Sequence, residues 1–364
     1  MATLARIRRL STSPLTARSY PLRPRATPRR NGPLLALVAV IVLAAGCGSS
    51  QSTSASSHQS GAHHKRAKAG ARPAPPRPLT LSYRPLFSLP APLRDPASAV
   101  IGGGRFVLIG GLDAADTSSA EIDVASSHGL LHTATLPLAQ HDAQGAALAG
   151  KVYVFGGGSF SELNHIVSFD PVSNAVGGAG TLPRAQSDVA VTKLDGTAYI
   201  VGGYDGTNWL NTILAWRPGS GVRVAGRLPV GLRYSSVSPV DGRLVIIGGS
   251  TPAGATDAIY SFDPASGRVA RIGRLPHPIT HAGAATLGSY VYLVGGRGDN
   301  LDTQTASVWS INPLTGAVHT AGRLPRPLSD TGVLAVGGAI IVAGGLTPAG
   351  TVAPGVGELV PPGG

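Results

Sequence analysis

The sequence predicts an all-β protein in which one four-stranded unit occurs six times and the units close into a ring. Two marks recur with the same spacing. A glycine doublet follows an apolar, strand-like segment at intervals of 46, 46, 46, 47 and 49 residues, at 110–111, 156–157, 202–203, 248–249, 295–296 and 344–345. A Leu-Pro pair recurs with a similar spacing, at 89–90, 136–137, 182–183, 228–229, 275–276 and 324–325. Such a period with strand-like content is typical of β-propeller blades.

The copy that begins at residue 182 illustrates how one unit is built. Its four predicted strands cover residues 189–192, 198–201, 211–216 and 222–226. Asp195-Gly196 joins the first two strands as a two-residue turn, because both residue types tolerate a positive φ. The doublet ends the second strand where a side chain would collide with neighbouring backbone. The loops after each doublet and after each Leu-Pro pair lie on one face of the predicted ring, and function is expected there.

The ring is expected to close through the N-terminal side of the propeller. The sixth copy supplies strands over 331–336 and 339–343 and a third within 351–360, but no fourth. Residues 79–88 stand before the first Leu-Pro pair, where a fourth strand would fall. We predict that these residues complete the sixth blade, which removes two exposed strand edges. Seven blades are the alternative, but the sequence has no seventh doublet.

The net charge of +12 belongs to the N-terminal part of the chain. Residues 1–78 contain thirteen Lys and Arg and no Asp or Glu, which leaves 17 basic and 18 acidic side chains in residues 79–364. A propeller so close to neutral does not favour a nucleic-acid partner. The only cysteine is Cys47, so internal disulfides and cysteine-based metal sites are excluded. No cofactor and no metal site is expected, and we expect a monomer.

Residues 1–46 are predicted to form a signal peptide, and residues 47–78 a disordered Ser-, Pro- and Lys/Arg-containing tether. The apolar run 34–45 would extend only about 18 Å as a helix, less than the ~30 Å hydrocarbon core of a bilayer. Its end, Leu43-Ala-Ala-Gly-Cys47, resembles the lipobox of bacterial lipoproteins. This resemblance implies acylation of Cys47, for example with palmitate, and anchoring to the outer side of the cytoplasmic membrane. A non-acylated secretory signal and a chance apolar stretch are the alternatives.

Several short patterns resemble kelch repeats. They are the doublets after strands such as Val152-Tyr-Val154, the segment Tyr204-Asp-Gly-Thr-Asn-Trp-Leu-Asn211 behind one doublet, and the Phe-Asp-Pro turns that begin at Phe169 and Phe262. The similarity covers about residues 79–360 and implies four-stranded blades. The tryptophan that kelch repeats usually have in the fourth strand is absent from every copy. Smaller residues are therefore expected to pack between the blades.

The candidate site is a ring of polar residues at the mouth of the central channel. It consists of the residues that stand six positions after each leucine of a Leu-Pro pair: Asp95, Asp142, Asp188, Tyr234, His281 and Asp330. Ser235 replaces Tyr234 if that copy is shifted by one residue. The ring could bind a cation, a polyol or a sugar. The structural alternative is that each aspartate caps backbone N–H groups of its own turn. Convergence of the carboxylates would raise their pKa values.

Other charged and aromatic residues are expected on the same face. The charged ones are Arg94, Arg233, Arg297 and Glu162, and Trp209 could stack on a sugar ring or pack against its own blade. Galactose-oxidase-like chemistry is excluded, because it needs a Tyr–Cys crosslink and the propeller has no cysteine.

We expect a lipid-anchored, extracytoplasmic binding or scaffold protein that recognises a protein or a glycan with its loop face and catalyses no reaction. The alternative is a sugar mutarotase or epimerase, because exported six-bladed kelch proteins of bacteria include sialic-acid mutarotases. No sequence motif of that group is matched here, so no residue role is taken from it. In the alternative, the candidate catalytic residues are Asp142, Asp188, His281 and Asp330. A purely structural component of the cell envelope is a third hypothesis.

Overall fold

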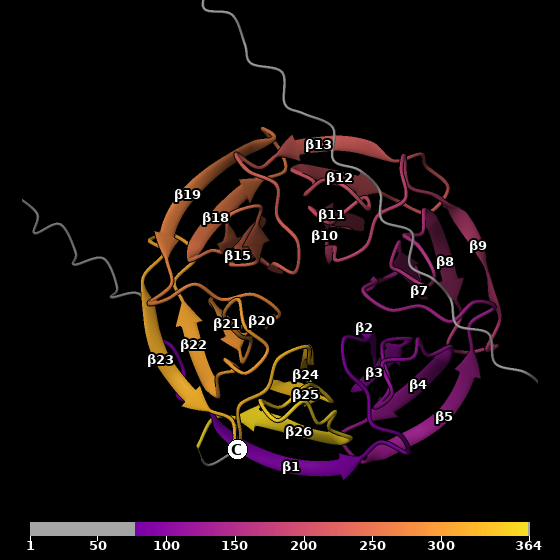
Figure 1. The fold of residues 1–364 in the computed structure, drawn as a ribbon, viewed down its shortest axis with the longest axis horizontal. Coiled ribbons are helices and arrows are strands. Elements are labelled where there is room, and N and C mark those ends of the chain that lie inside the picture. The colour runs from indigo at the N-terminus through magenta and orange to yellow at the C-terminus, as the bar shows by residue number, and fades with distance from the viewer. Residues whose placement is uncertain (1–76, 363–364) are drawn as a thin grey trace, which may run out of the picture. The chain divides into compact units, whose positions relative to one another are not determined.

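The computed structural model describes residues 77–362, and this part of the chain contains strands and no helix. Six antiparallel four-stranded sheets surround a central axis (Figure 1), which confirms the prediction of an all-β, six-bladed β-propeller. The predicted signal segment 1–46, Cys47 and nearly all of the predicted tether lie outside the described residues. None of the elements within residues 77–362 is a helix of the length and apolarity needed to cross a membrane.

Each blade runs from an innermost strand at the axis to an outermost strand at the rim. We number the blades by their innermost strands, blade 1 to blade 6: β2 (Ala97–Gly102), β6 (Gln144–Leu148), β10 (Ala190–Leu194), β14 (Ser236–Val240), β20 (Gly283–Leu287) and β24 (Gly332–Val336). The second strands, in the same order, are β3 (Arg105–Ile109), β7 (Lys151–Phe155), β11 (Thr197–Val201), β15 (Arg243–Ile247), β21 (Tyr290–Val294) and β25 (Ala339–Ala343).

The third strands are β4 (Glu121–Ser126), β8 (His165–Phe169), β12 (Thr212–Trp216), β18 (Ala258–Asp263), β22 (Ser307–Ile311) and β26 (Gly355–Val360). The outermost strands are β5 (Gly129–Thr135), β9 (Val176–Thr181), β13 (Arg223–Arg227), β19 (Arg268–Arg274), β23 (Val318–Arg323) and β1 (Ser82–Ser88). Blade 4 also carries a small hairpin directly after its doublet, β16 (Ser250–Thr251) with β17 (Gly254–Ala255). In the third blade, the observed strands lie within two residues of the predicted ones.

The sixth blade joins the two ends of the propeller. Strand β1 pairs antiparallel with β26, from Ser82 opposite Val360 to Ser88 opposite Gly355, with a bulge after Pro85. The two strands lie side by side at the rim, next to the C-terminal label in Figure 1. The predicted closure of the ring by residues 79–88 is therefore confirmed.

The glycine doublets connect each blade to the next. In all six copies the N–H of the second glycine donates to a carbonyl in the Leu-Pro loop of the following blade, as Gly203 does to Leu232 at 2.8 Å. Both glycines of every doublet have positive φ, for example 64° at Gly202. A Cβ on Gly202 would fall inside the contact radius of the Leu232 carbonyl oxygen. Glycine is thus needed for its conformation and for the close approach of the next blade.

Hydrophobic clusters lie between neighbouring blades, and six of them complete the ring. Between blades 2 and 3, Trp216 of β12 packs on Tyr153 and Phe155 of β7, with ring centroids 4.8 and 5.4 Å away. The expectation that smaller residues fill these spaces was wrong here. At this position a tryptophan of the third strand, Trp216, fills the space between the two sheets.

A channel and a recess at the loop face

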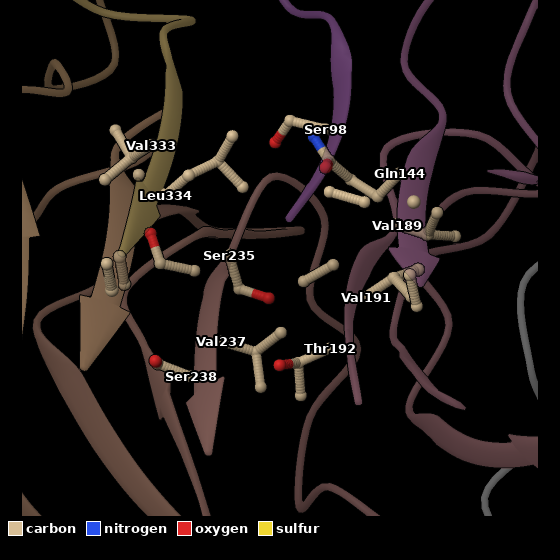
Figure 2. A pocket seen from close by; sticks show the side chains of 18 of the residues that line it. Ser98, Gln144, Val189, Val191, Thr192, Ser235, Val237, Ser238, Val333 and Leu334 are labelled. Carbon is tan, nitrogen blue, oxygen red and sulfur yellow. The ribbon is translucent and has the colours of Figure 1, made fainter. Parts of the chain in front are cut away.

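The innermost strands enclose a central channel of about 530 Å³ (Figure 2). Its wall consists mainly of uncharged side chains, among them Ser98, Gln144, Val191, Thr192, Ser235, Val237, Ser238, Val333 and Leu334. The Oγ of Ser235 is buried there without a hydrogen-bond partner. Because the innermost strands have no neighbour on the channel side, their free edges also offer backbone donors and acceptors to it.

The six predicted ring residues all line this channel and share one backbone conformation. They are Asp95, Asp142, Asp188, Tyr234, His281 and Asp330, and their φ angles lie between 51° and 58°. Five backbone hydrogen bonds of 2.7–3.2 Å link successive members, each from an N–H to the carbonyl of the equivalent residue in the preceding blade. The ring thus fastens the blades together around the mouth. Tyr234, and not Ser235, occupies the position in blade 4.

The backbone explains why aspartate recurs in this ring. Asp is among the few residue types that adopt a left-handed conformation readily. The carboxylates are used differently from the predicted capping of their own turns, since their partners are side chains. Asp142 accepts a hydrogen bond from Tyr234 Oη at 3.2 Å, Asp188 forms an ion pair with Arg233, and Asp330 accepts a hydrogen bond from the hydroxyl of Ser329.

Tyr234 departs from this preference, whereas histidine, like aspartate, is found comparatively often at positive φ. A bulky side chain in the left-handed region costs about 1–2 kcal/mol relative to the right-handed one. Tyr234 nevertheless adopts this conformation, and its ring stacks on that of His281, with centroids 3.7 Å apart and planes inclined by 24°. Backbone strain of this kind tends to mark functional sites. Both residues line the channel on one side and a second cavity on the other.

This second cavity is a recess of about 470 Å³ that shares Tyr234 and His281 with the channel mouth. Loops of blades 3, 4 and 5 form it: Trp209, Arg233, Ser250, Thr251, Pro252, Gly254, Thr280, Arg297 and Asp299 line it with the two shared residues. Asp299 accepts a hydrogen bond from the N–H of Ala255 at 2.6 Å and so holds the β16–β17 hairpin to blade 5.

Arg233 forms the inner wall of the recess. Its guanidinium carbon lies 4.3 Å from the ring centre of Tyr204 and 5.5 Å from that of Trp209, which contact each other edge to face. Its ion pair with Asp188 anchors it from below. Trp209 therefore packs against its own blade and also faces the recess. Its indole Nε1 is buried without a hydrogen-bond partner.

His281 is held as a neutral imidazole. Arg297 Nη2 donates to its Nε2 at 3.0 Å, and the opposite ring nitrogen, Nδ1, lies 3.0 Å from the Thr280 hydroxyl. Burial, followed by the nearby cations Arg297 and Arg233, lowers the pKa of His281 well below its usual value. Arg297 also has a buried Nε without a partner.

The carboxyl groups are shifted in the opposite direction. Burial is the main cause that raises the pKa of Asp188 to about 7, and the nearby Asp142 adds to it while Arg233 opposes it. Burial and then the Asp142 carboxylate raise the pKa of Asp95 well above its usual value. Burial also raises the pKa of Asp330, against a hydrogen bond from Ser329 and the charge of Arg297. The predicted direction therefore holds for these three groups, with burial as the larger cause.

The predicted site residues thus fall into four groups. Tyr234 and His281 line both cavities, whereas Trp209, Arg233 and Arg297 line only the recess and the four ring aspartates only the channel. Arg94 lines neither, because its guanidinium turns to Asp116 at 2.7 Å. Glu162 lines neither and approaches Gly206.

Sequence reasoning missed the recess residues Thr251, Thr280 and Asp299. Thr251 and Asp299 stand shortly after glycine doublets, as Arg297 does, and Thr280 immediately precedes a ring position. The loop-face rule could therefore have singled them out. Within residues 77–362, no three His, Cys, Asp or Glu side chains are grouped so as to hold a metal ion.

Comparisons with known proteins agree with this architecture. A sequence model of the Kelch motif matches residues 278–325, which span the strands of blade 5. Residues 278–325 thus match the Kelch motif, and the described part of the chain forms a six-bladed β-propeller. No curated protein matches the sequence significantly.

Among the solved structures, 1066 chains match, so the fold alone does not indicate a function. One of them, "Structure of YjhT", has a TM-score of 0.66 and 15% sequence identity, and the match covers 76% of this chain and 97% of that chain. At this identity the likeness concerns the fold.

Proposed function

We propose that the protein is a binding propeller that recognises a glycan in the loop-face recess. The observation that carries this proposal is the position of Tyr234 and His281. Two of six equivalent positions depart from aspartate, and they are the only described residues that line both the channel and the recess. One of them, Tyr234, also adopts a backbone conformation that is unfavourable for its side chain.

The recess suits a sugar better than a protein surface. Small-molecule sites are concave, with aromatic walls and a few placed polar groups, whereas protein interfaces extend over wider areas. Here Trp209 and Tyr234 supply aromatic surface, and Arg233 and Arg297 supply donors. Two arginines further favour a sugar that carries a carboxylate.

The binding proposal is tested with the full chain and three sugars: glucose, glucuronate and N-acetylneuraminate. Saturation-transfer NMR is expected to detect an acidic sugar, with at least tenfold weaker binding in Arg297→Gln. Arg243→Gln, an exposed arginine of β15 outside both cavities, serves as the control and is expected to bind like the wild type. Equal loss in both variants, or binding of none of the three sugars, would contradict the proposal.

A mutarotase is the second candidate, because titratable groups lie close together beside the recess. The His281 Nε2 atom is 3.8 Å from an Asp330 oxygen, and Tyr234 Oη is 3.2 Å from Asp142. A neutral imidazole could take the proton of an anomeric hydroxyl and return it to the ring oxygen while the bond between the anomeric carbon and that oxygen breaks. The ring would then reclose on the other face of the carbonyl.

The exposure of these groups limits which of them could touch a sugar. The side chain of His281 is 9% exposed, but those of Asp188 and Asp330 are only 1% and 3% exposed. In this second candidate function His281 acts on the sugar, and the aspartates position and polarise it. Faster exchange between anomers of N-acetylneuraminate, measured by NMR and lost in His281→Ala and Asp188→Asn, would support it. An unchanged exchange rate at saturating protein would exclude it for this sugar.

We further propose that Cys47 anchors the protein by acyl chains to the outer side of the cytoplasmic membrane. The support is the lipobox-like sequence before Cys47. Each buried methylene contributes about 0.8 kcal/mol to membrane affinity, so several acyl chains together exceed the roughly 5 kcal/mol that the five basic residues of the tether supply. Fractionation of a Cys47→Ala variant is the test, and a full-size variant that stays in the membrane fraction would refute the anchor.

A further inference from the structure

The outermost strands have an asymmetric charge pattern. The six strands together contain seven arginines and no aspartate or glutamate. All seven arginines lie on four consecutive blades, on β13, β19, β23 and β1, whereas β5 and β9 have none. They are Arg84, Arg223, Arg227, Arg268, Arg271, Arg274 and Arg323, and every one of them is exposed. The net charge of the propeller is therefore close to zero, although the outermost strands of four consecutive blades are positively charged.

Some of this charge is already neutralised and some is not. Arg271 and Arg274 pair with Asp257, and Arg84 pairs with Glu358. Among the described residues, Arg223, Arg227, Arg268 and Arg323 form no ion pair within 4.0 Å, nor does the nearby exposed Arg326. Five arginines on or beside the outermost strands of consecutive blades thus lack a carboxylate partner in the described part of the chain.

Protection of sheet edges does not account for this distribution. Charged residues on an edge strand prevent it from pairing with other chains. All six outermost strands present such an edge, yet β5 and β9 carry no charge at all. A requirement shared by every blade would not confine arginine to four neighbouring ones.

We propose that the rim of blades 3 to 6 binds a flexible polyanion, a chain of repeated phosphate groups. Figure 1 shows β13, β19, β23 and β1 following one another along the convex outer edge of the ring. A flat lipid surface can touch such an edge on one or two blades only, whereas a flexible chain can follow its curve. Arginine suits this partner, because its planar guanidinium pairs with phosphate oxygens and remains charged at any physiological pH.

The rim is distinct from the recess that the proposed function uses. It lies on the outermost strands, and none of its arginines lines the recess or the channel. A polymer held there leaves the loop face open for a glycan. The two sites can therefore be disabled one at a time.

Binding of inorganic polyphosphate to the full chain, measured by titration at several salt concentrations, tests the inference. The rim variant carries Arg223→Gln, Arg227→Gln, Arg268→Gln and Arg323→Gln. A charge-matched control carries Lys151→Gln, Arg184→Gln, Arg217→Gln and Arg243→Gln, at exposed positions off the outermost strands. Both variants lose four positive charges, and both keep the basic N-terminal region.

The expected result is a difference in salt dependence. Each lost phosphate contact lowers the slope of log affinity against log salt by about 0.7, so the rim variant should lose about 3 in slope and bind tenfold or more weakly at 0.1 M salt. The control should lose less than about 1 in slope. An equal loss in both variants would show that only net charge matters and would overturn the inference.

Two further probes test the class of partner. Binding to phosphatidylglycerol vesicles that is as tight as to polyphosphate at equal phosphate concentration would overturn the choice of a flexible chain. A single-stranded oligonucleotide that binds more tightly than polyphosphate of equal charge would show that bases are read, and would also overturn it. Weaker binding to both probes supports the proposal. Circular dichroism of the two variants confirms that they remain folded.

Discussion

The aromatic rings of Tyr234 and His281 lie face to face at 3.7 Å and line both cavities of the loop face. Their backbone N–H and carbonyl groups are also joined, since His281 donates to the Tyr234 carbonyl at 3.2 Å. One pair of residues thus connects two blades through the main chain and separates two spaces with its side chains. Substitutions at this pair are expected to separate the two roles.

Tyr234→Phe removes only the hydroxyl that donates to Asp142. Hydrogen bonds to charged groups contribute about 1.5–3 kcal/mol when buried, and partial exposure reduces this, so we expect a loss of about 1 kcal/mol in the free energy of unfolding. Tyr234→Ala also removes the stacked ring and should cost about 3 kcal/mol. Denaturant titration of both variants gives the comparison. Equal losses in the two variants would mean that the stack contributes nothing.

Leu81 is expected to be the main apolar anchor just before the closing strand. It is 3% exposed and belongs to the cluster between blades 5 and 6, while its N–H donates to Ala321 at 2.6 Å. Leu81→Ala should destabilise the protein by about 2–4 kcal/mol. Leu79→Ala, at a position that is 41% exposed, should change stability by less than about 0.5 kcal/mol. Thermal unfolding distinguishes the two, and similar melting temperatures would contradict an anchoring role.

Gly202 tests the contact that a doublet makes with the next blade. An alanine there adds a Cβ that collides with the Leu232 carbonyl and occupies a φ of 64°. Gly242 has a similar φ of 73° but open space around it. We expect Gly242→Ala to cost about 1 kcal/mol from the backbone alone, and Gly202→Ala at least about 2 kcal/mol more. Equal costs in denaturant titrations would show that the collision is relieved by a small shift.

Asp123 is expected to make stability depend on pH. It is buried in β4 with one oxygen unpartnered, and burial, with the nearby Glu121 second, raises its pKa to about 6 from the usual 3.8. As the pH rises, the Asp123 carboxyl ionises at a lower pH in the unfolded chain than in the folded protein. The free energy of unfolding therefore falls between about pH 4 and pH 6. Above pH 6 both states are ionised and the loss is constant.

Asp123→Asn removes that loss. The variant should match the wild type near pH 4 and exceed it by about 3 kcal/mol at pH 8, since the pKa is raised from 3.8 to about 6 and each pKa unit corresponds to about 1.4 kcal/mol. Unfolding free energies measured at intervals between pH 4 and 8 give the curve. A constant difference across this range would mean that Asp123 does not titrate with a raised pKa.

Repetition made much of the fold predictable. The doublets and Leu-Pro pairs fix the blade count, and the missing fourth strand of the last copy identifies the role of residues 79–88. The positions of the ring residues were predicted from their constant distance to the Leu-Pro pairs. The backbone hydrogen bonds between ring residues were not predicted, because a sequence shows that an aspartate recurs in each copy but not that the N–H of Asp188 reaches the Asp142 carbonyl at 2.9 Å.

The recess was not predictable, because it depends on the features that differ between copies. The β16–β17 hairpin occurs in blade 4 only among the described blades, and a single hydrogen bond from Ala255 to Asp299 holds it to blade 5. Arg94 is the opposite case, a residue that was predicted to belong to the site and does not line it. It occupies the same position before the ring as Arg233, yet Asp116 in its own blade draws its guanidinium away. Which acid an arginine meets is decided by loop geometry.

The pairing of Ser82 with Val360 has a consequence for how the molecule is made. During translation β1 leaves the ribosome long before its partner β26 exists, so its backbone must wait unpaired while five blades are synthesised. Contacts so distant along the chain form late and slowly. The ring of the propeller therefore stays open until β26, the partner of β1, has been synthesised.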